Sequence, residues 1–369
     1  MNLSPALQKA YTEEQLTARE AQHLAEFIAW GPIVFQVSRL MIKFGILEML
    51  RNAPKGLTRQ EICQQTGLSD YAVKCLTEAS LCIGIILVDT ETDCFALSKT
   101  GWFLLNDPAT RVNIDFNHDV NYNGWFCLEE ALLSGKPEGL KHFGQWPTIY
   151  EGLSQLPAHV QKSWFGFDHF YSDSAFPEAL KIVFDEYRVR SLYDVGGNTG
   201  KWALQCVEYN QEVEVTILDL PQQIRMMQQN ISGKSGAERI KGYGIDLLDD
   251  ESEFPRIGKL DAIWMSQFLD CFSMEQIVGI LRMAKSAMTS DTRIFIMETL
   301  WDRQRFATAS MCLTLTSLYF TAMANGNSKM YNTEDMRQCI TAAGLEIEHI
   351  HDHLGQGHSI LVCKNASYK

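Results

Sequence analysis

The sequence lacks several features that mark specialised classes of protein. Its 32 Lys and Arg face 45 Asp and Glu, a net charge of −13, so it lacks the positive charge that nucleic acids and anionic membranes attract. Its ten cysteines include no Cys-x-x-Cys pair, so the usual zinc and disulfide-scaffold spacings are missing. The first residues lack the basic stretch followed by an apolar run that is typical of a signal peptide. The sequence also lacks a continuous apolar run of the roughly 18 residues that a membrane span needs. We therefore expect a cytoplasmic protein with no nucleic-acid or membrane partner.

The chain has enough apolar residues for more than one compact domain. Of its 369 residues 46% are hydrophobic, and domains typically span about 100–200 residues. Three patterns follow one another, and we predict an N-terminal, mainly helical domain over residues 1–110, a helical, aromatic-rich connector over 111–180 and an α/β domain over 181–369.

Helical and then strand-like patterns organise the first region. Thr58 is followed three residues later by Glu61, a capping box for a short helix that Gly67 ends. After a second helix, residues 85–88 and 94–97 flank a polar turn, as in a β-hairpin. The order helix, helix, hairpin predicts a winged-helix domain. Its would-be recognition helix has one Lys and two acidic residues over positions 70–78, which disfavours DNA binding.

Strands alternate with helical segments in the last region. We predict a parallel, doubly wound sheet with helical crossovers and a final antiparallel hairpin. The predicted strands are 192–195, 213–218, 240–245, 260–265 and 292–297, and the hairpin comprises 345–350 and 359–362.

A glycine-rich turn follows the first of these strands. The segment Asp194–Gly200 lies between the strand and a predicted helix, and glycines there let the backbone approach a ligand at the carboxyl end of the strand. A dinucleotide fingerprint would need glycine at position 195, which is Val, and Asp194 would repel a pyrophosphate. The turn therefore indicates a ligand that presents an amino group rather than NAD.

Acidic residues also follow the second and third strands. Asp219 is placed to accept hydrogen bonds from the two hydroxyls of a ribose, and Asp246 follows the third strand where an adenine would lie. Together with the glycine turn, these acids predict a site for a cationic or zwitterionic nucleoside.

On these motifs the chain resembles the S-adenosylmethionine-dependent small-molecule O-methyltransferases with an N-terminal winged-helix dimerisation domain, which include plant caffeate-type and bacterial antibiotic-pathway enzymes. The matching segments are 194–200, 217–221, 244–247, 332–344 and Gly135–Pro137. The resemblance implies a Rossmann-like class I methyltransferase fold, a homodimer, S-adenosyl-L-methionine as cofactor and S-adenosyl-L-homocysteine as product.

The resemblance also implies which residues bind the cofactor. The methionine part would lie on Gly196 and the neighbouring backbone, the ribose on Asp219, and the adenine on Asp246 and Leu247. Ser266 and Gln267 would lie beside the cofactor, and the remaining members of the expected set are Asp194, Gly197, Gly200 and Leu220. Asn198 stands where the family has its third loop glycine, and Asn tolerates the left-handed backbone better than most residues.

The expected catalytic histidine is missing. Asp270 occupies the position of the family's general base, and Glu298 matches the position that orients that base. A free Asp, with a pKa of about 3.9, is a poor base for a phenol of pKa about 10. If Asp270 and Glu298 face each other, their repulsion would leave one protonated near neutral pH and able to transfer a proton.

Three explanations of the missing base stay open. The acceptor is already acidic, another residue such as His142 or His169 is the base, or the methyl group goes to carbon or nitrogen. A second family Glu is also replaced, near residues 330–331. A cofactor-binding or regulatory protein without catalysis is the alternative outside enzymes. O-methylation of a small aromatic metabolite is the favoured activity.

A late apolar helix over residues 310–325 would line the acceptor pocket. The resemblance suggests substrate contacts from Tyr319, Phe320, Met323 and Asn325, and Met and aromatic walls suit a flat ring. The histidines at 349, 351 and 353 alternate along a strand, as in a three-His metal site. Their expected place in a terminal hairpin argues against a metal, and none is predicted.

Overall fold

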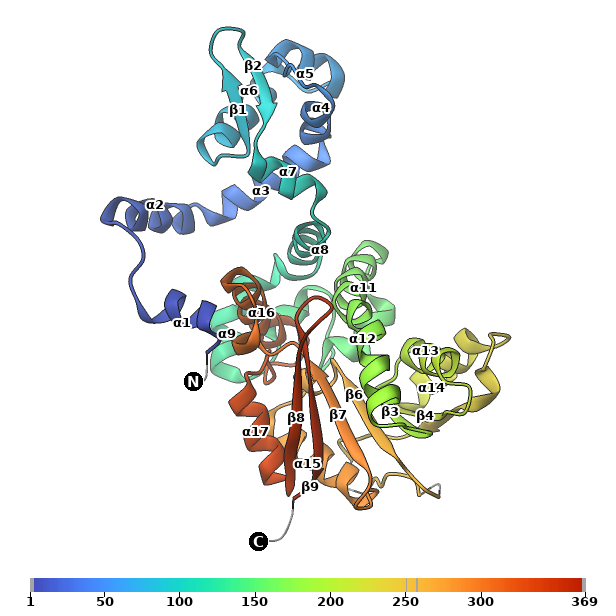
Figure 1. Cartoon of the computed structure of the whole chain (residues 1–369). Helices are drawn as coiled ribbons and strands as arrows, with labels where there is room; N and C mark the ends of the chain where they lie inside the picture. Colours follow the sequence, from blue (N-terminus) through green and yellow to red (C-terminus); the bar gives the residue numbers. More distant parts are fainter. Residues whose placement is uncertain (1–2, 250, 257, 367–369) are drawn as a thin grey trace. The chain divides into compact units, whose positions relative to one another are not determined.

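The computed structural model describes residues 3–249, 251–256 and 258–366 (Figure 1). The chain divides into two compact units. We call Glu14–Asp119 the helical unit and the rest of the described chain the sheet unit. The N-terminal residues before Glu14 belong to the sheet unit because the Ser4 hydroxyl donates to the Gln304 carbonyl at 3.0 Å and Leu7 is fully buried. The predicted N-terminal domain over residues 1–110 included these first residues, whereas the structure places them in the sheet unit. The domain boundaries at residues 110 and 180 stay a prediction.

The helical unit contains the capped helices and the hairpin expected from the sequence. Thr58 and Glu61 form the capping box, and Gly67 ends that helix with a φ of 73°. The elements are α2 (Ala18–Ala29), α3 (Gly31–Lys43), α4 (Ile46–Asn52), α5 (Arg59–Thr66), α6 (Asp70–Cys82), β1 (Ile86–Asp89), β2 (Cys94–Leu97), α7 (Lys99–Asn106) and α8 (Pro108–Phe116). The antiparallel pairing of β1 with β2 confirms the predicted hairpin.

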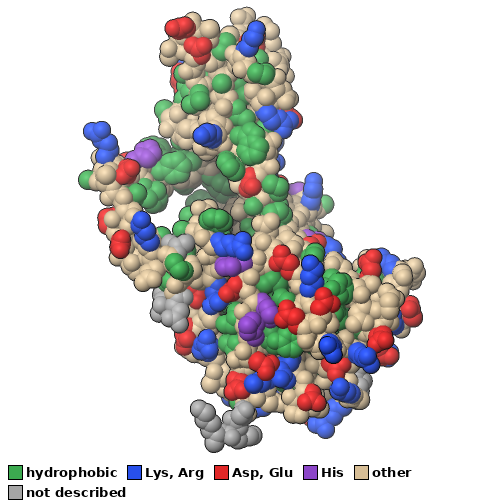
Figure 2. Space-filling model, in the orientation of Figure 1, with side chains coloured by type: hydrophobic (Ala, Val, Ile, Leu, Met, Phe, Trp, Pro, Cys, Tyr) green, Lys and Arg blue, Asp and Glu red, His purple; other side chains and the backbone are tan. Residues whose placement is uncertain are grey.

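Helix α2 has an apolar face that its own unit leaves exposed. No residue of the helix is buried, and Ile28 and Trp30 keep 68% and 63% of their surface accessible. Figure 2 shows hydrophobic side chains gathered over α2 and the start of α3. Such a patch marks an interaction surface more often than an isolated apolar residue does.

The described strands of the sheet unit form one seven-stranded sheet in the order β5-β4-β3-β6-β7-β9-β8. The first five are parallel, and β9 pairs antiparallel with β7 and β8. This confirms the predicted doubly wound sheet with a final hairpin. The bounds are β3 (Ser191–Val195), β4 (Glu214–Asp219), β5 (Ile240–Gly244), β6 (Ala262–Ser266), β7 (Arg293–Glu298), β8 (Leu345–Leu354) and β9 (His358–Asn365).

Helices cover both faces of this sheet, as its buried side chains require. One apolar core joins the sheet to α12 (Phe176–Leu180), α13 (Lys201–Tyr209) and α14 (Pro221–Ile231), and the other joins it to α15 (Met274–Ser286) and α17 (Thr333–Ala342). The remaining α-helices described in this unit are α1 (Pro5–Thr12), α9 (Leu128–Ser134), α10 (Ile149–Gly152), α11 (Ala158–Ser172) and α16 (Ala307–Tyr319), which the π-helical turn Phe320–Ala324 extends.

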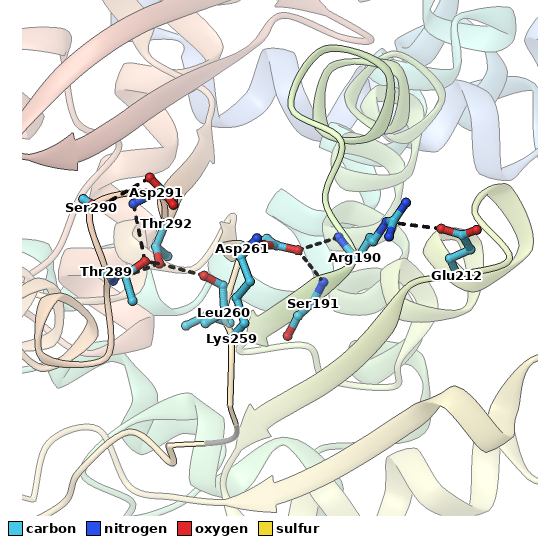
Figure 3. A network of polar contacts seen from close by, with 10 residues as sticks. All are labelled: Arg190, Ser191, Glu212, Lys259, Leu260, Asp261, Thr289, Ser290, Asp291 and Thr292. Atoms are coloured by element: carbon cyan, nitrogen blue, oxygen red, sulfur yellow. Dashed lines mark hydrogen bonds and ion pairs between the residues drawn. The ribbon is translucent and has the colours of Figure 1, made fainter.

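A network of satisfied polar groups fixes the amino ends of the central strands (Figure 3). Asp261 Oδ2 accepts the backbone N–H groups of Arg190 and Ser191 at 2.9 and 3.2 Å. The Thr292 hydroxyl donates to the Leu260 carbonyl at 2.7 Å and accepts the N–H of Thr289 at 3.0 Å. These bonds tie the starts of β3, β6 and β7 together.

One described helical stretch, Ala307–Ala324, is long and apolar enough to cross a membrane, with 39% of its residues buried inside the structure. The bent pair of α2 and α3 passes the same test if counted as one span. Phe320 and Met323 of the first stretch are buried, as expected for a core helix.

Candidate functional site

The carboxyl ends of the parallel strands bring the predicted acids to one edge of the sheet. Asp194 lies in β3, Asp219 ends β4 and Glu298 ends β7. The order β4-β3-β6-β7 places these strand ends side by side, and Asp194 and Glu298 are 2% and 4% exposed. In open α/β folds, ligands usually bind in the crevice outside the carboxyl ends of the strands.

The glycine turn after β3 has little space for side chains. Gly196 has a φ of 71°, and a Cβ there would lie 2.3 Å from the Phe268 ring. A Cβ on Gly197 would lie 2.6 Å from Asp194 Oδ2, and Gly200 has a φ of 77°. Glycine is therefore required at these three positions by conformation, by contact or by both. The turn presents bare backbone to a ligand.

Asp194 has an unsatisfied carboxylate oxygen beneath this turn. Its Oδ2 is buried and finds no hydrogen-bond partner among the described residues. Burial and the nearby Asp219 raise the pKa of Asp194 to about 8. A buried acceptor without a partner is costly, so a ligand that brings an ammonium or N–H group to this region would stabilise the ionised carboxylate.

Asp219 holds the glycine turn in place. Its Oδ2 accepts the N–H of Asn198 at 2.9 Å, and its Oδ1 accepts the N–H of Leu220 at 2.7 Å. Asn198 has a φ of 47°, which confirms that Asn adopts the left-handed backbone here. Each oxygen keeps a second lone pair for a ligand hydroxyl.

The remaining predicted cofactor residues lie at the ends of neighbouring strands. Leu220 and Asp246 are exposed and Leu247 is half-buried. Ser266 ends β6. Gln267 follows with a φ of 45°, and its buried Oε1 has no hydrogen-bond partner in the described part of the chain.

Asp270 and Glu298 are buried close together. Glu298 Oε1 accepts the N–H groups of Phe268 and Leu269 at 3.1 and 2.9 Å, while its buried Oε2 lacks a partner within the described residues. Burial, then Asp270, raises the pKa of Glu298 well above its usual range. Burial, then Asp168, raises the pKa of Asp270 to about 7. An acid that titrates near neutral pH is able to accept and return a proton.

Comparison with known proteins identifies the architecture. Residues 22–95 match a Dimerisation2-like domain, and residues 172–346 match an O-methyltransferase domain. The second match contains the glycine turn and both buried acids. The chain therefore carries a Dimerisation2-like domain and an O-methyltransferase domain.

Curated relatives of this methyltransferase have similar lengths. Cephaeline 6′-O-methyltransferase of Carapichea ipecacuanha is 23% identical over 261 residues, 69% of this chain and 70% of that protein. Demethylspheroidene O-methyltransferase of Cereibacter sphaeroides is 24% identical over 281 residues, 76% and 71% of the two chains. The solved S-adenosylmethionine-dependent methyltransferase SibL shares the fold, with a TM-score of 0.70 and 20% identity over 92% of this chain and 98% of that chain.

The four residues predicted to contact the substrate differ in the neighbours that surround them. Tyr319 and Phe320 are 4% and 5% exposed, and Met323 is fully buried, packed where side chains on Gly124 and Gly139 would collide with its sulfur. Asn325 Nδ2 donates to the Cys271 carbonyl at 2.7 Å. Asn325 therefore positions the turn that carries Asp270.

Three residues near Asp270 carry no motif and were not predicted. Tyr150 of α10 has a buried hydroxyl beside the Cys271 thiol, and burial, then Cys271, raises the pKa of Tyr150 well above its usual range. Trp164 of α11 donates to the Tyr319 hydroxyl at 2.7 Å. Asp168 lies one helical turn after Trp164. Only the packing of α10 and α11 brings them to the site.

The histidines considered at the sequence level lie in different places. His142 is exposed. His169 Nε2 lies 4.0 Å from Asp168 Oδ2. The rings of His349 and His351 are 4.4 Å apart, but irregular register interrupts their strand before and after this pair. Among the described residues, no three His, Cys, Asp or Glu side chains converge as metal ligands would.

Proposed function

We propose that the protein transfers a methyl group from S-adenosyl-L-methionine to a hydroxyl of a small aromatic acceptor, with S-adenosyl-L-homocysteine as product. The observation that carries this proposal is the glycine turn over the unsatisfied Asp194 carboxylate. Its bare backbone and its acid suit the methionine part of the cofactor, which is zwitterionic. The O-methyltransferase match over residues 172–346 supports transfer to oxygen, and nothing in the site favours carbon, nitrogen or a regulatory role.

The cofactor-binding assignment follows the strand ends. Asp194, Gly196, Gly197 and Gly200 would hold the methionine part, Asp219 and Leu220 the ribose, and Asp246 and Leu247 the adenine. Ser266 and Gln267 would lie beside the cofactor, where the unsatisfied Gln267 amide oxygen can accept a hydrogen bond. When bound, the cofactor supplies an electrophilic methyl group on a sulfonium.

The chain contributes proton transfer and positioning. Asp270 would accept the hydroxyl proton as the acceptor oxygen attacks the methyl carbon. Glu298 would hold the turn through the N–H groups of Phe268 and Leu269 and, when protonated, limit repulsion within the pair. Alignment of the acceptor with the methyl group supplies much of the rate in such an in-line displacement.

We further propose that the chain forms a homodimer through the helical unit and acts in the cytoplasm. The exposed apolar face of α2 and the Dimerisation2-like match support the dimer. The acidic composition is compatible with the predicted location. The winged-helix assignment of α5, α6 and the β1–β2 hairpin belongs to the same proposal.

Thermal unfolding with ligands tests the cofactor site. S-adenosyl-L-homocysteine at about 100 times its dissociation constant should stabilise the protein by about 2.7 kcal/mol, and NAD should not. A shift with NAD alone, or with neither ligand, would contradict the proposal. Incubation of labelled S-adenosyl-L-methionine with a panel of phenols then tests transfer.

A further inference from the structure

The turn that carries Asp270, residues 268–272, has little regular structure of its own, and we call it the acid-bearing turn. It contains a single 3-10 turn, Leu269–Cys271, in which the Phe272 N–H donates to the Leu269 carbonyl at 3.1 Å. Hydrogen-bond geometry in a 3-10 turn is poor, and such short pieces serve as connectors. Contacts with other elements therefore decide where the Asp270 carboxyl lies.

Two side chains hold the carbonyl groups that follow Asp270. Asn325 Nδ2 donates to the Cys271 carbonyl at 2.7 Å, and the Tyr331 hydroxyl donates to the Phe272 carbonyl at 2.7 Å. The N–H groups of the two residues before Asp270 are bonded to the last residue of β7. The acid-bearing turn is thus bound through its N–H groups to β7 and through its carbonyl groups to the loop between α16 and α17.

The orientation of the Asn325 amide follows from its partners. Its Oδ1 accepts the N–H groups of Asn327 and Ser328, both at 3.1 Å, so its Nδ2 is the atom left for the Cys271 carbonyl. The same residue ends the π-helical turn after α16, because its own N–H donates to the Phe320 carbonyl at 3.1 Å. Asn325 therefore joins the helix predicted to line the acceptor pocket to the acid-bearing turn.

The side chain of Tyr331 is attached to the acid-bearing turn in two ways. The residue is 5% exposed, and its ring belongs to the apolar core against which Phe268 and Phe272 of the turn pack. A buried tyrosine hydroxyl usually finds a hydrogen-bond partner, and here that partner is the Phe272 carbonyl. Apolar packing and a hydrogen bond therefore act together at the end of the turn.

The loop that carries Tyr331 has its own anchors in the sheet unit. The Met330 N–H donates to the Ser317 hydroxyl of α16 at 3.2 Å. The N–H and hydroxyl of Thr333, at the start of α17, donate to Asp302 Oδ1 at 3.0 and 3.1 Å. Because these bonds do not involve the acid-bearing turn, the loop provides a fixed support for it.

We infer that Tyr331 is a positioning residue for methyl transfer: together with Asn325 it holds the Asp270 carboxyl in a fixed place relative to α16. The inference rests on the proposed function, in which Asp270 accepts the hydroxyl proton. The Tyr331 hydroxyl takes no part in that transfer, because it already donates to the Phe272 carbonyl. Loss of this bond would leave the acid present but misplaced, and a displacement of about 1 Å lowers a rate by up to about 100-fold.

Hydrogen exchange tests the hold on the turn without any acceptor. In protein saturated with S-adenosyl-L-homocysteine, Tyr331→Phe should speed amide exchange in peptides that cover residues 268–272 by about tenfold, the factor that one net hydrogen bond corresponds to. Tyr193→Phe is the matched control, because it removes another buried tyrosine hydroxyl that donates to a backbone carbonyl, that of Pro255. It should leave exchange in residues 268–272 unchanged. Equal exchange in Tyr331→Phe and in the unaltered protein would overturn the inference.

Turnover on two phenols shows whether this hold serves proton transfer. para-Cresol must lose its proton to Asp270, whereas para-nitrophenol is largely ionised in mildly alkaline buffer. Tyr331→Phe should lower kcat for para-cresol by about 10- to 100-fold, with little change in KM, and should lower kcat for para-nitrophenol much less. A merely structural loss would lower both rates by the same factor. Tyr193→Phe should leave the ratio of the two rates unchanged.

Two results with these phenols would overturn the inference: unchanged turnover of para-cresol in Tyr331→Phe, and equal losses on both phenols. Asn325→Leu also frees the end of α16, so it should raise the KM for para-cresol as well as lower kcat, and an unchanged KM would remove the link to α16. Failure of S-adenosyl-L-homocysteine to bind, or of the unaltered protein to methylate any phenol of the panel, would instead contradict the proposed function. Hydrogen exchange still decides whether Tyr331 holds the turn, so the two failures are distinguishable.

Discussion

The two edges of the same sheet treat polar groups in opposite ways. At the amino edge, Asp261 and Thr292 have hydrogen-bond partners for the side-chain oxygens that face the protein (Figure 3). At the carboxyl edge, Asp194 Oδ2 and Glu298 Oε2 are buried and have none among the described residues. Strands β3, β6 and β7 contribute to both edges. Under the proposed function, the bonded carboxylate of Asp261 at the amino edge stabilises the fold, whereas the unbonded oxygens of Asp194 and Glu298 at the carboxyl edge are available to a ligand.

Neutralising one acid at each edge should separate activity from stability most strongly. Asp270→Asn should lower turnover by about 10²- to 10⁴-fold because the proton acceptor is removed, while the melting temperature stays equal or rises because a buried acid is lost. The rate of methyl transfer to an accepted phenol measures turnover, and a thermal scan measures stability. Unchanged turnover would remove Asp270 from the mechanism; Asp261→Asn is the control.

Filling the glycine turn should weaken the cofactor site with a smaller effect. In Gly196→Ala the new Cβ would meet the Phe268 ring at 2.3 Å on a left-handed backbone, which alone costs about 1–2 kcal/mol. Affinity for S-adenosyl-L-homocysteine should fall at least about tenfold, as calorimetry would measure. Gly233→Ala, also at positive φ but in open space, should leave this affinity intact, and equal losses in both variants would argue against a ligand-facing turn.

Removing a satisfied acid at the amino edge should affect stability alone. Asp261→Ala leaves the N–H groups of Arg190 and Ser191 without their acceptor, at a cost of about 1–3 kcal/mol in the free energy of unfolding. Urea denaturation measures this loss. Turnover per folded molecule should not change, and a loss of turnover without a loss of stability would reverse the assignment of the two edges.

The two edges should also differ in their response to pH. The raised pKa of Asp194, about 8, means that the folded ligand-free protein binds more protons than the unfolded chain, so this group's contribution falls as pH rises from about 4 to 8. The Arg293 guanidinium lowers the pKa of Glu348, so that contribution is present above the unfolded pKa and is lost as pH falls. Melting temperatures across this range should decline less steeply in Asp194→Asn; a steeper decline would contradict the assignment.

The smallest expected effect concerns the turn residue that departs from the family. Asn198→Gly should relieve the left-handed backbone at φ 47° while keeping the N–H bond to Asp219. We expect a change in unfolding free energy within about 1 kcal/mol and unchanged affinity for S-adenosyl-L-homocysteine. A large loss of affinity would show that the Asn198 side chain itself contacts the cofactor.

The sequence predicts the cofactor half of the site better than the acceptor half. Asp194, Gly196 and Asp219 follow strands whose periodicity is strong, and parallel strands necessarily bring their ends together. Asp168 and Tyr150 lie on helices whose position depends on tertiary packing, and no local pattern separates a pocket residue from a surface residue there. Sequence spacing likewise places Met323 on an apolar helix face but cannot tell that it fills the space left by Gly124 and Gly139.

The close approach of Phe268 to Gly196 has a consequence for how this chain can evolve. The ring occupies the space that any side chain at 196 would need, and the Phe268 N–H is held by Glu298 at the base of the acid-bearing turn. Substitutions in the glycine turn would therefore shift the turn that carries Asp270. Substitutions in the turn that carries Asp270 would likewise shift the glycine turn and the cofactor site. Among homologues, residues 196 and 268 should covary, and acceptor range should diversify through α10 and α11 instead.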